Sequence, residues 1–471
     1  MITNWTASDL AQITSGIWHG PAPVLPLEQV EIDHRNLDKT GLFIALKGNH
    51  HDGHDFVADL TMGHCALVSR QFDGACCAQL KVPDTLSALH DIAKAAMAQT
   101  TAKKIAITGS VGKTSTKEAL DTILSCYGNC HASRGNYNNH IGAPLSMART
   151  PDDCDLIVME MGMNHKGEIS PLSYLYHGDV AIITKIANSH IGHFDSLGDI
   201  ACAKAEIFDG MTDGTAILPY DDAHFDILRD KAKAKGLHLI TFGTGKGADI
   251  QLIKQASLEK GQSLSLYNHL SGESLTFTLG LSAPHHATTA MIAIATLHAL
   301  SLPWQMAETK LAQLQEVTGR GDQSFVNLGQ KTALFINDSY NAGPASMAAS
   351  LQHIASLTHA KKGIVLTDML ELGHMSDEAH QSLIPLIRAT GPQRLILIGP
   401  AMSALASSIH IDGDISAFGS ADEAKDKLHG LLADCDLILI KGSNGSGAPQ
   451  MARLLSALTI QNDKAEAHDV T

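Results

Sequence analysis

The sequence has few aromatic residues, little basic charge and no long apolar run. Phe, Trp and Tyr make up 4% of the 471 residues, and no apolar stretch approaches the roughly 18 residues that a membrane helix requires. Lys and Arg number 34 against 49 Asp and Glu, which gives a formal net charge of −15. Nucleic acids are bound through clustered Lys and Arg. We therefore expect neither a nucleic-acid partner nor stable membrane association.

The sequence also lacks paired cysteines and a targeting segment. Its eight cysteines form no C-x-x-C pair and lie mostly within apolar stretches, as expected of reduced thiols. No basic segment followed by an apolar one opens the chain, since the first lysine is Lys39. Export is not expected from such a start. These observations predict a cytoplasmic protein.

The length of the chain bears on its domain count. A chain of 471 residues is too long for one ordinary hydrophobic core and suggests about three domains. Pro83 precedes a stretch with apolar residues at helical spacing, and Pro303 follows an alanine-rich helical stretch. We place domain boundaries at these prolines, which gives residues 1–83, 84–303 and 304–471. The fold class that we expect is α/β in all three.

Short apolar runs predict the strands. In the first domain they are separated by turn residues, which fits a small α/β unit. In the second and third, near-continuous apolar strands alternate with helical stretches, as in parallel sheets covered on both faces. Ligands of such sheets bind beyond the carboxyl ends of the strands. The predicted strands are residues 30–35, 41–47 and 65–68, then 105–108, 156–160, 180–184, 215–218 and 238–242, and finally 333–337, 363–367, 394–398 and 437–440.

One of these strands leads into a glycine turn and then a helix. Gly109 and Gly112 let the backbone turn tightly, so that successive N–H groups face one spot at the positive end of the helix, where phosphate binds. Lys113 adds a charge for the terminal phosphates, and the Thr114 hydroxyl suits Mg²⁺. The common loop pattern requires a glycine where this chain has Ile107, so the loop is a short form. It predicts binding of ATP or a related nucleotide.

Other strand ends in the second domain carry further candidates. Glu160 ends one strand and is the expected second oxygen ligand of Mg²⁺, although a carboxylate there could also cap a helix or form an ion pair. His190 follows another strand, and Lys204 lies in a helical stretch. Taken alone, a loop histidine and a helix-surface lysine are ordinary features. The residues by themselves leave the roles of these two open.

A series of motifs runs through all three predicted domains. In order, they are Thr108-Gly-Ser-Val-Gly-Lys-Thr-Ser115, Asn136-Tyr-Asn-Asn-His-Ile-Gly-Ala-Pro144, Met159-Glu-Met-Gly-Met-Asn-His-Lys-Gly-Glu168, Ala203-Lys-Ala-Glu-Ile-Phe208, Thr318-Gly-Arg-Gly321 and Asn337-Asp-Ser-Tyr-Asn-Ala342. This series resembles that of the Mur ligases, in which ATP drives formation of an amide bond during peptidoglycan precursor synthesis. The resemblance implies three α/β domains: a UDP-binding unit, a central P-loop ATPase domain and a Rossmann-like C-terminal domain that binds the incoming dipeptide.

Two further stretches bear on the substrate. Residues 338–347 and 368–373 most resemble the family members that add D-alanyl-D-alanine to the UDP-N-acetylmuramoyl tripeptide, and the D-N-P-R signature of the preceding ligase is missing. The resemblance implies that a substrate carboxylate attacks the γ-phosphate of ATP and that the dipeptide amine then displaces phosphate from the acyl phosphate. It implies ATP and Mg²⁺ as cofactors, and we expect a monomer.

The resemblance also implies the role of each site residue. Thr114 and Glu160 would hold a first Mg²⁺, His190 would hold a second, and Lys204 matches a lysine that relatives carry as a metal-binding carbamate. The implied catalytic residues are Lys113, Glu160, His190, Lys204 and Arg320. The implied nucleotide-binding residues are Thr108, Gly109, Ser110, Val111, Gly112, Lys113, Thr114, Arg320, Asp338, Tyr340 and Asn341. The implied substrate residues are Asp33 and Arg35 for UDP, Asn138 and Asn139 for the muramoyl end, and Asp368 and Glu371 for the dipeptide.

The sequence departs from the family pattern at four positions. Ala287 and Ala290 stand where relatives commonly have asparagines, one of them set against adenine. Lys185 replaces an asparagine near the metal-site histidine, and Cys202 replaces a lysine found in some relatives.

Two other functions remain open at this point. A folylpolyglutamate-synthetase-like ligase would share the loop and the lysine, although residues 338–347 suit it less. A nucleotide-binding P-loop protein without ligase activity is the second alternative, to which Ala287 and Ala290 point.

Overall fold

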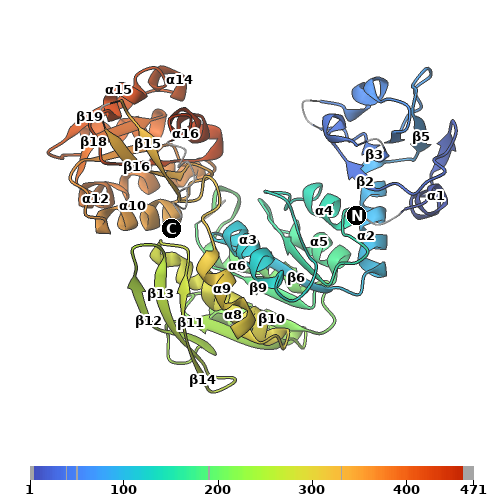
Figure 1. The fold of residues 1–471 in the computed structure, drawn as a ribbon, viewed down its shortest axis with the longest axis horizontal. Coiled ribbons are helices and arrows are strands. Elements are labelled where there is room, and N and C mark those ends of the chain that lie inside the picture. Colours follow the sequence, from blue (N-terminus) through green and yellow to red (C-terminus); the bar gives the residue numbers. More distant parts are fainter. Residues whose placement is uncertain (1–4, 39, 49–50, 189–190, 330, 460–471) are drawn as a thin grey trace, which may run out of the picture.

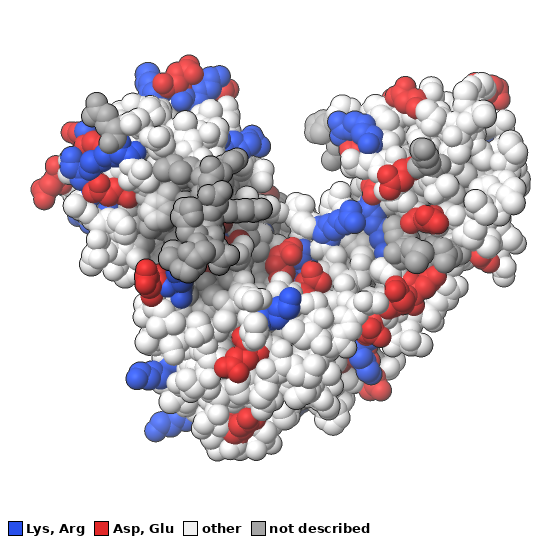
Figure 2. All heavy atoms as spheres, in the orientation of Figure 1, with Lys and Arg blue, Asp and Glu red and all other residues white. Residues whose placement is uncertain are grey.

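The computed structural model describes residues 5–38, 40–48, 51–188, 191–329 and 331–459. Three sheets organise these residues, and each lies in its own body (Figure 1). The N-terminal and C-terminal bodies stand as two arms over the central one, and an open notch separates them (Figure 2). The three-domain α/β architecture is confirmed, whereas the boundaries at residues 83 and 303 stay predictions. No helix in the described ranges has the length and apolar character needed to cross a membrane.

The N-terminal sheet has five strands in the order β1-β5-β4-β3-β2, and only the β1 edge is antiparallel. Its strands are β1 (Ile17–His19), β2 (Gln29–Glu31), β3 (Gly41–Ile44), β4 (Cys65–Val68) and β5 (Ala78–Lys81). The prediction of a strand over residues 30–35 was wrong beyond Glu31. The Asp33 carboxylate accepts a hydrogen bond from the backbone N–H of Arg35 and starts a 3-10 turn, η1 (His34–Asn36). A local side-chain bond thus competes with the strand.

The central sheet has nine strands in the order β14-β13-β12-β11-β10-β9-β6-β8-β7. They are β6 (Lys103–Thr108), β7 (Cys130–Ala132), β8 (Leu156–Glu160), β9 (Val180–Ile183), β10 (Thr215–Pro219), β11 (His238–Gly243), β12 (Ile250–Ser257), β13 (Gln262–Asn268) and β14 (Glu273–Leu279). Strands β6 to β12 pair in parallel, which confirms the five strands predicted there. The antiparallel meander β12–β14 was not predicted. In β13, buried and half-buried residues alternate instead of forming a continuous apolar run.

Helices cover both faces of the central sheet. Successive residues of β6 point to opposite faces: Ile105 and Ile107 pack in the core beneath one helical layer, and Ala106 packs in the core beneath the other. The first layer contains α3 (Lys113–Leu124), α8 (Ala287–Ala299) and α9 (Glu308–Gln313). The second contains α2 (Thr85–Gln99), α4 (Gly142–Ala148), α5 (Ile169–Tyr176), α6 (Leu197–Lys204) and α7 (Phe225–Ala234). This burial on both faces explains the near-continuous apolar strands.

The C-terminal sheet has six strands in the order β15-β16-β20-β17-β18-β19, and only the β15 edge is antiparallel. Its strands are β15 (Asp322–Asn327), β16 (Thr332–Asp338), β17 (Lys362–Thr367), β18 (Pro392–Ile398), β19 (Asp414–Phe418) and β20 (Leu437–Lys441). Its helices are α10 (Pro344–Ser356), α11 (Ser376–Gln381), α12 (Ile384–Ala389), α13 (Pro400–Ala404), α14 (Ala421–Ala424), α15 (Leu428–Leu432) and α16 (Ala448–Ser456). The edge strands β15 and β19 were missed, because their residues are more exposed than those of the inner strands.

A buried ion pair joins the N-terminal sheet to the central body. Arg149, which ends α4, pairs with Glu31 at the end of β2, and each side chain is only 7% exposed. Arg149 Nε also donates to the Val30 carbonyl oxygen over 2.7 Å. A charge buried without its partner is far more costly than the complete pair. The pair therefore holds the N-terminal arm in a defined orientation.

We predict that Arg149→Met destabilises the junction by about 3–5 kcal/mol, because Glu31 is left buried without its cation. Denaturant unfolding followed by tryptophan fluorescence measures this, since Trp5 and Trp18 both lie in the N-terminal body. The double variant Arg149→Met with Glu31→Gln should recover part of the loss. If the double variant is less stable than the single one, the explanation is wrong.

Candidate active site

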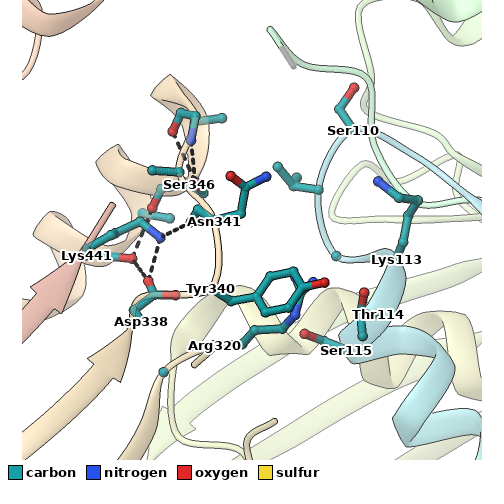
Figure 3. A pocket seen from close by; sticks show the side chains of 18 of the residues that line it. Ser110, Lys113, Thr114, Ser115, Arg320, Asp338, Tyr340, Asn341, Ser346 and Lys441 are labelled. Atoms are coloured by element: carbon teal, nitrogen blue, oxygen red, sulfur yellow. Dashed lines mark hydrogen bonds and ion pairs between the residues drawn. The ribbon is translucent and has the colours of Figure 1, made fainter. Parts of the chain in front are cut away.

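A cavity of about 630 Å³ lies between the carboxyl ends of the central and C-terminal sheets (Figure 3). Segments of both domains form its wall, among them the β6–α3 loop, the end of β8, the start of α8, the stretch before β15, the β16–α10 loop and the end of β20. They contribute, among others, Lys113, Thr114, Glu160, Thr289, Arg320, Asp338, Tyr340, Asn341 and Lys441. Parallel strands of both sheets thus deliver their ends to one space, where ligands of such folds bind.

The β6–α3 loop has the backbone expected of a phosphate site. Gly112 is the N-cap of α3 and has a φ of 82°, in the left-handed region. A Cβ at Gly109 would lie only 1.9 Å from Thr184 Oγ1. That hydroxyl donates to the Val111 carbonyl over 2.6 Å, and Ser110 Oγ donates to the Ala187 carbonyl over 2.9 Å. The segment after β9 therefore fixes the loop against the start of the helix.

Lys113 places a cation over this loop. Its ammonium donates to the Gly109 carbonyl oxygen over 2.8 Å. Burial lowers the pKa of Lys113, the Glu160 carboxylate opposes this shift, and the Arg320 guanidinium adds to it. Two cations therefore face one space, an arrangement that suits a ligand carrying several negative charges.

Hydrogen bonds from two different segments hold the Glu160 carboxylate. Thr114 Oγ1 donates to its Oε2 over 2.8 Å, and Asn138 Nδ2 donates to its Oε1 over 2.7 Å. The Glu160 side chain is buried, so these two bonds determine its position. A hydroxyl beside a carboxylate at a phosphate loop is the arrangement that holds Mg²⁺ on a bound nucleotide. The described residues contain no group of three His, Cys, Asp or Glu able to hold a metal by themselves.

Lys204 lies at the end of α6 and is 2% exposed. Burial holds its pKa well below the usual range, the Lys113 cation adds to this, and Glu160 acts in the opposite direction. The three groups are therefore close enough to interact electrostatically, although Lys204 does not itself line the cavity among the described residues. A buried lysine of low pKa carries a neutral, nucleophilic amine.

The C-terminal domain closes the other side of the cavity. The Arg320 guanidinium stacks 4.0 Å from the centre of the Tyr340 ring, which points toward the Thr114 side in Figure 3. Lys441 Nζ donates to Asp338 Oδ2 over 2.7 Å and to the Asn341 carbonyl over 3.3 Å. These contacts hold the loop after β16 in a fixed shape.

The proposed substrate residues divide into two groups. Asn138 and Glu371 line the cavity. Asn139 Oδ1 instead accepts the backbone N–H groups of Ile141 and Gly142. The other three proposed residues lie outside the described cavity wall.

Asp33 and Arg35 pair with each other in the N-terminal domain, with Arg35 Nη2 2.6 Å from Asp33 Oδ2. The Asp368 carboxylate accepts the backbone N–H of Met402 over 2.7 Å and that of Ala401 over 3.3 Å. The structure thus gives Asp368 a local partner at the start of α13. Its proposed role at the dipeptide stays untested, as do those of Asp33 and Arg35.

Several other positions bear on the predictions. Lys185 lines the cavity, so a cation does stand near the nucleotide loop. Ala287 and Ala290 are buried in α8 and do not line the cavity. His190 lies outside the described residues. Cys202 lies in α6, and nothing in the structure explains its presence there.

Sequence reasoning missed Lys441 and His285, which both line the cavity. Lys441 follows directly on a predicted strand, so the rule that ligands bind at strand ends could have found it. The side chain of His285 is exposed at the cavity, and partial desolvation there together with the neighbouring His286, His353 and Lys441 lowers its pKa. No sequence signal marked that residue, because its neighbours His353 and Lys441 belong to the C-terminal domain and only folding brings them near it.

The fold and the site together define a P-loop protein whose cavity is completed by a C-terminal domain, and comparison with known families identifies the class as that of the Mur ligases. Residues 107–297 match the Mur ligase middle domain, and residues 325–444 match the Mur ligase glutamate ligase domain. The chain belongs to the Mur ligase family, as its motifs predicted.

Particular relatives share most of their length with this chain. The UDP-N-acetylmuramoyl-tripeptide--D-alanyl-D-alanine ligase of Rickettsia prowazekii is 32% identical over 88% of this chain and 92% of its own. The crystal structure of MurF from Acinetobacter baumannii superposes with a TM-score of 0.84 at 31% identity, covering 97% of this chain and 99% of that one. The MurF ligase of Thermotoga maritima, solved with ADP, has a TM-score of 0.74 at 21% identity, covers 91% and 97%, and shows a shared fold.

We predict that Gly109→Ala weakens nucleotide binding about tenfold or more, because the added methyl group collides with Thr184 and displaces the loop. Titration calorimetry with ADP measures this. Gly74→Ala is the matched control, since Gly74 also has a positive φ, of 88°, but its Cβ would meet nothing within 4 Å. Equal ADP affinity in Gly109→Ala and the wild type would contradict the assigned role of the loop.

Proposed function

We propose that this protein joins D-alanyl-D-alanine to the UDP-N-acetylmuramoyl tripeptide, with ATP as the energy source, in peptidoglycan precursor synthesis. The observation that carries the proposal is the cavity in which the phosphate loop, Glu160 and the C-terminal residues Asp338 and Tyr340 meet. Family membership and the names of the similar ligases support it. They favour it over a folylpolyglutamate synthetase or a P-loop protein without ligase activity.

The reaction consists of two displacements. An oxygen of the tripeptide carboxylate attacks the γ-phosphorus of ATP, the bond to the β,γ-bridging oxygen breaks, and ADP leaves. The dipeptide amine then attacks the acyl carbon, and inorganic phosphate leaves with the electron pair of the broken C–O bond. The amine loses a proton as the amide forms.

The residues of the cavity suit these steps because both bring anions together. Lys113 and Arg320 supply positive charge where the carboxylate approaches the γ-phosphate. Thr114 and Glu160 would hold Mg²⁺, which neutralises phosphate charge when bound. Lys204, Asp338 and Asn341 complete the proposed set, and His190 stays a proposal from sequence alone. Domain closure excludes the water that would hydrolyse an acyl phosphate.

Each domain is proposed to bind a different part of the substrates. Residues 1–83 hold the UDP group through Asp33 and Arg35, and residues 304–471 receive the dipeptide near Asp368 and Glu371. Asn138 and Asn139, in the central domain, are proposed to contact the muramoyl end of the UDP-linked substrate. We further propose that the protein acts in the cytoplasm as a monomer.

The proposal predicts that ATP, UDP-N-acetylmuramoyl tripeptide and D-alanyl-D-alanine together yield a product heavier than the tripeptide by one dipeptide minus water. Mass spectrometry of the mixture tests this. Lys113→Ala should lower kcat by about 10²–10³, because one pre-organised charge at the reacting phosphate is lost. The exposed Lys246→Ala is the matched control and should retain the wild-type rate. Phosphate release that depends on glutamate and folate instead would overturn the substrate assignment.

A second prediction concerns the dependence of the reaction on Mg²⁺. Chelation by EDTA should stop phosphate release, and added Mg²⁺ should restore it, because the cluster at Glu160 needs a cation to neutralise phosphate.

A third prediction concerns Lys204. The low pKa of Lys204 makes its neutral amine available to CO₂. Protein equilibrated with ¹³C-bicarbonate should therefore show a carbamate resonance that Lys204→Ala lacks. Absence of that resonance in the active wild type would refute carbamate formation.

A further inference from the structure

Lys117 is a fully buried lysine one helical turn after the phosphate loop. It lies on α3, and its side chain has no exposed surface. It does not line the cavity among the described residues, and none of the roles proposed above uses it. A buried ammonium is costly unless all its protons are paired, so its partners indicate what it does.

The three partners of Lys117 lie on two segments. Its Nζ donates to the carbonyl oxygens of Ser133 and Gly135, the latter over 3.1 Å. The third contact is with Glu118 Oε1 on the same helix, at 2.7 Å. One ammonium therefore holds two carbonyl groups, two residues apart, of the segment that follows β7. A lysine provides the three donors that this arrangement requires.

The segment that Lys117 holds leads directly into the site. Asn136 and Asn138 line the cavity, and Asn138 bonds to Glu160 as described above. Ser133 Oγ accepts the backbone N–H of Glu160 over 3.3 Å, and the Asn138 carbonyl accepts that of Gly162 over 2.8 Å. Residues 133–138 are thus tied to β8 on one side and to α3, through Lys117, on the other.

We propose that Lys117 is a positioning residue that sets the turn of residues 133–138, and with it Asn136 and Asn138, for the UDP-linked peptide substrate. This inference rests on the proposed function, because it takes that substrate to bind beside Asn138. Lys117 acts through backbone carbonyl groups and leaves the phosphate loop itself unchanged. The affinity for the UDP-linked substrate should therefore depend on it much more than the affinity for ATP.

Steady-state kinetics on the full-length protein test the proposal. Lys117→Met keeps most of the side-chain volume but leaves both carbonyl groups without a donor, so the KM for the UDP-linked tripeptide should rise about tenfold or more. The KM for ATP should change less than about twofold, which is below the effect of one lost hydrogen bond. Lys235→Met is the matched control, because half-buried Lys235 also donates to a backbone carbonyl, that of Asp209 over 2.8 Å, and neither residue lines the cavity.

Further measurements separate positioning from a general structural role. If Lys117 acts through Asn138, adding Lys117→Met to Asn138→Ala should raise the KM little beyond that of Asn138→Ala alone. Amide hydrogen exchange should increase at residues 133–138 and not at Gly109–Thr114. Should Lys117→Met fail to fold, Lys117→Gln, which keeps an amide donor, takes its place. Its KM for the UDP-linked tripeptide should then rise more than its KM for ATP.

The results of these experiments separate a failure of the Lys117 proposal from a failure of the proposed function. An unchanged KM for the UDP-linked substrate, or an equal loss of affinity for both substrates, overturns the proposal. Absence of ligase product from the wild type overturns the proposed function instead, and the hydrogen-exchange comparison then still decides whether Lys117 sets the turn.

Discussion

The site depends on one buried carboxylate that is held from two sides. Glu160 receives hydrogen bonds from Thr114 on the nucleotide helix and from Asn138 on the segment after β7. A buried carboxylate must be fully paired, so the two donors and the strand that carries Glu160 hold one another in place. The β6–α3 loop, the Glu160 carboxylate and the segment after β7 are therefore linked through a single side chain, and Lys117 holds the last of these segments to α3.

The C-terminal domain supplies the other side of the site, and its charged groups are also held in place by specific partners. Lys441 is buried against Asp338 and keeps the loop after β16 in shape. Arg320, on the connection between the domains, stacks on Tyr340 while its charge reaches Lys113. Positive groups from separate bodies thus converge on one cavity. This arrangement suits a ligand that carries several negative charges.

Much of the fold and of the candidate site could be predicted from the sequence, because the patterns that indicate them lie within short stretches of the chain. The phosphate loop is a short contiguous stretch whose glycines have a steric reason, as the clash at Gly109 shows. The parallel strands were found because both of their faces are buried. The meander β12–β14 was missed because only one of its faces is buried, and the strand over residues 30–35 was cut short by the Asp33 side chain. The hydrogen bonds from the backbone N–H groups at the start of α13 to Asp368 could not be predicted, because they join residues more than 30 positions apart, and its proposed role at the substrate stays untested.

The sequence by itself determined the fold class and the family, and it predicted the phosphate loop, since each depends on residue order and periodicity over short stretches. Only the tertiary structure decided which distant groups share one environment. The low pKa of Lys204 arises from burial and from the Lys113 cation 91 positions earlier in the chain, and the role of Lys117 depends on carbonyl groups that only folding brings to it. Burial and the approach of charges are properties of packed segments, so residue order alone does not specify them.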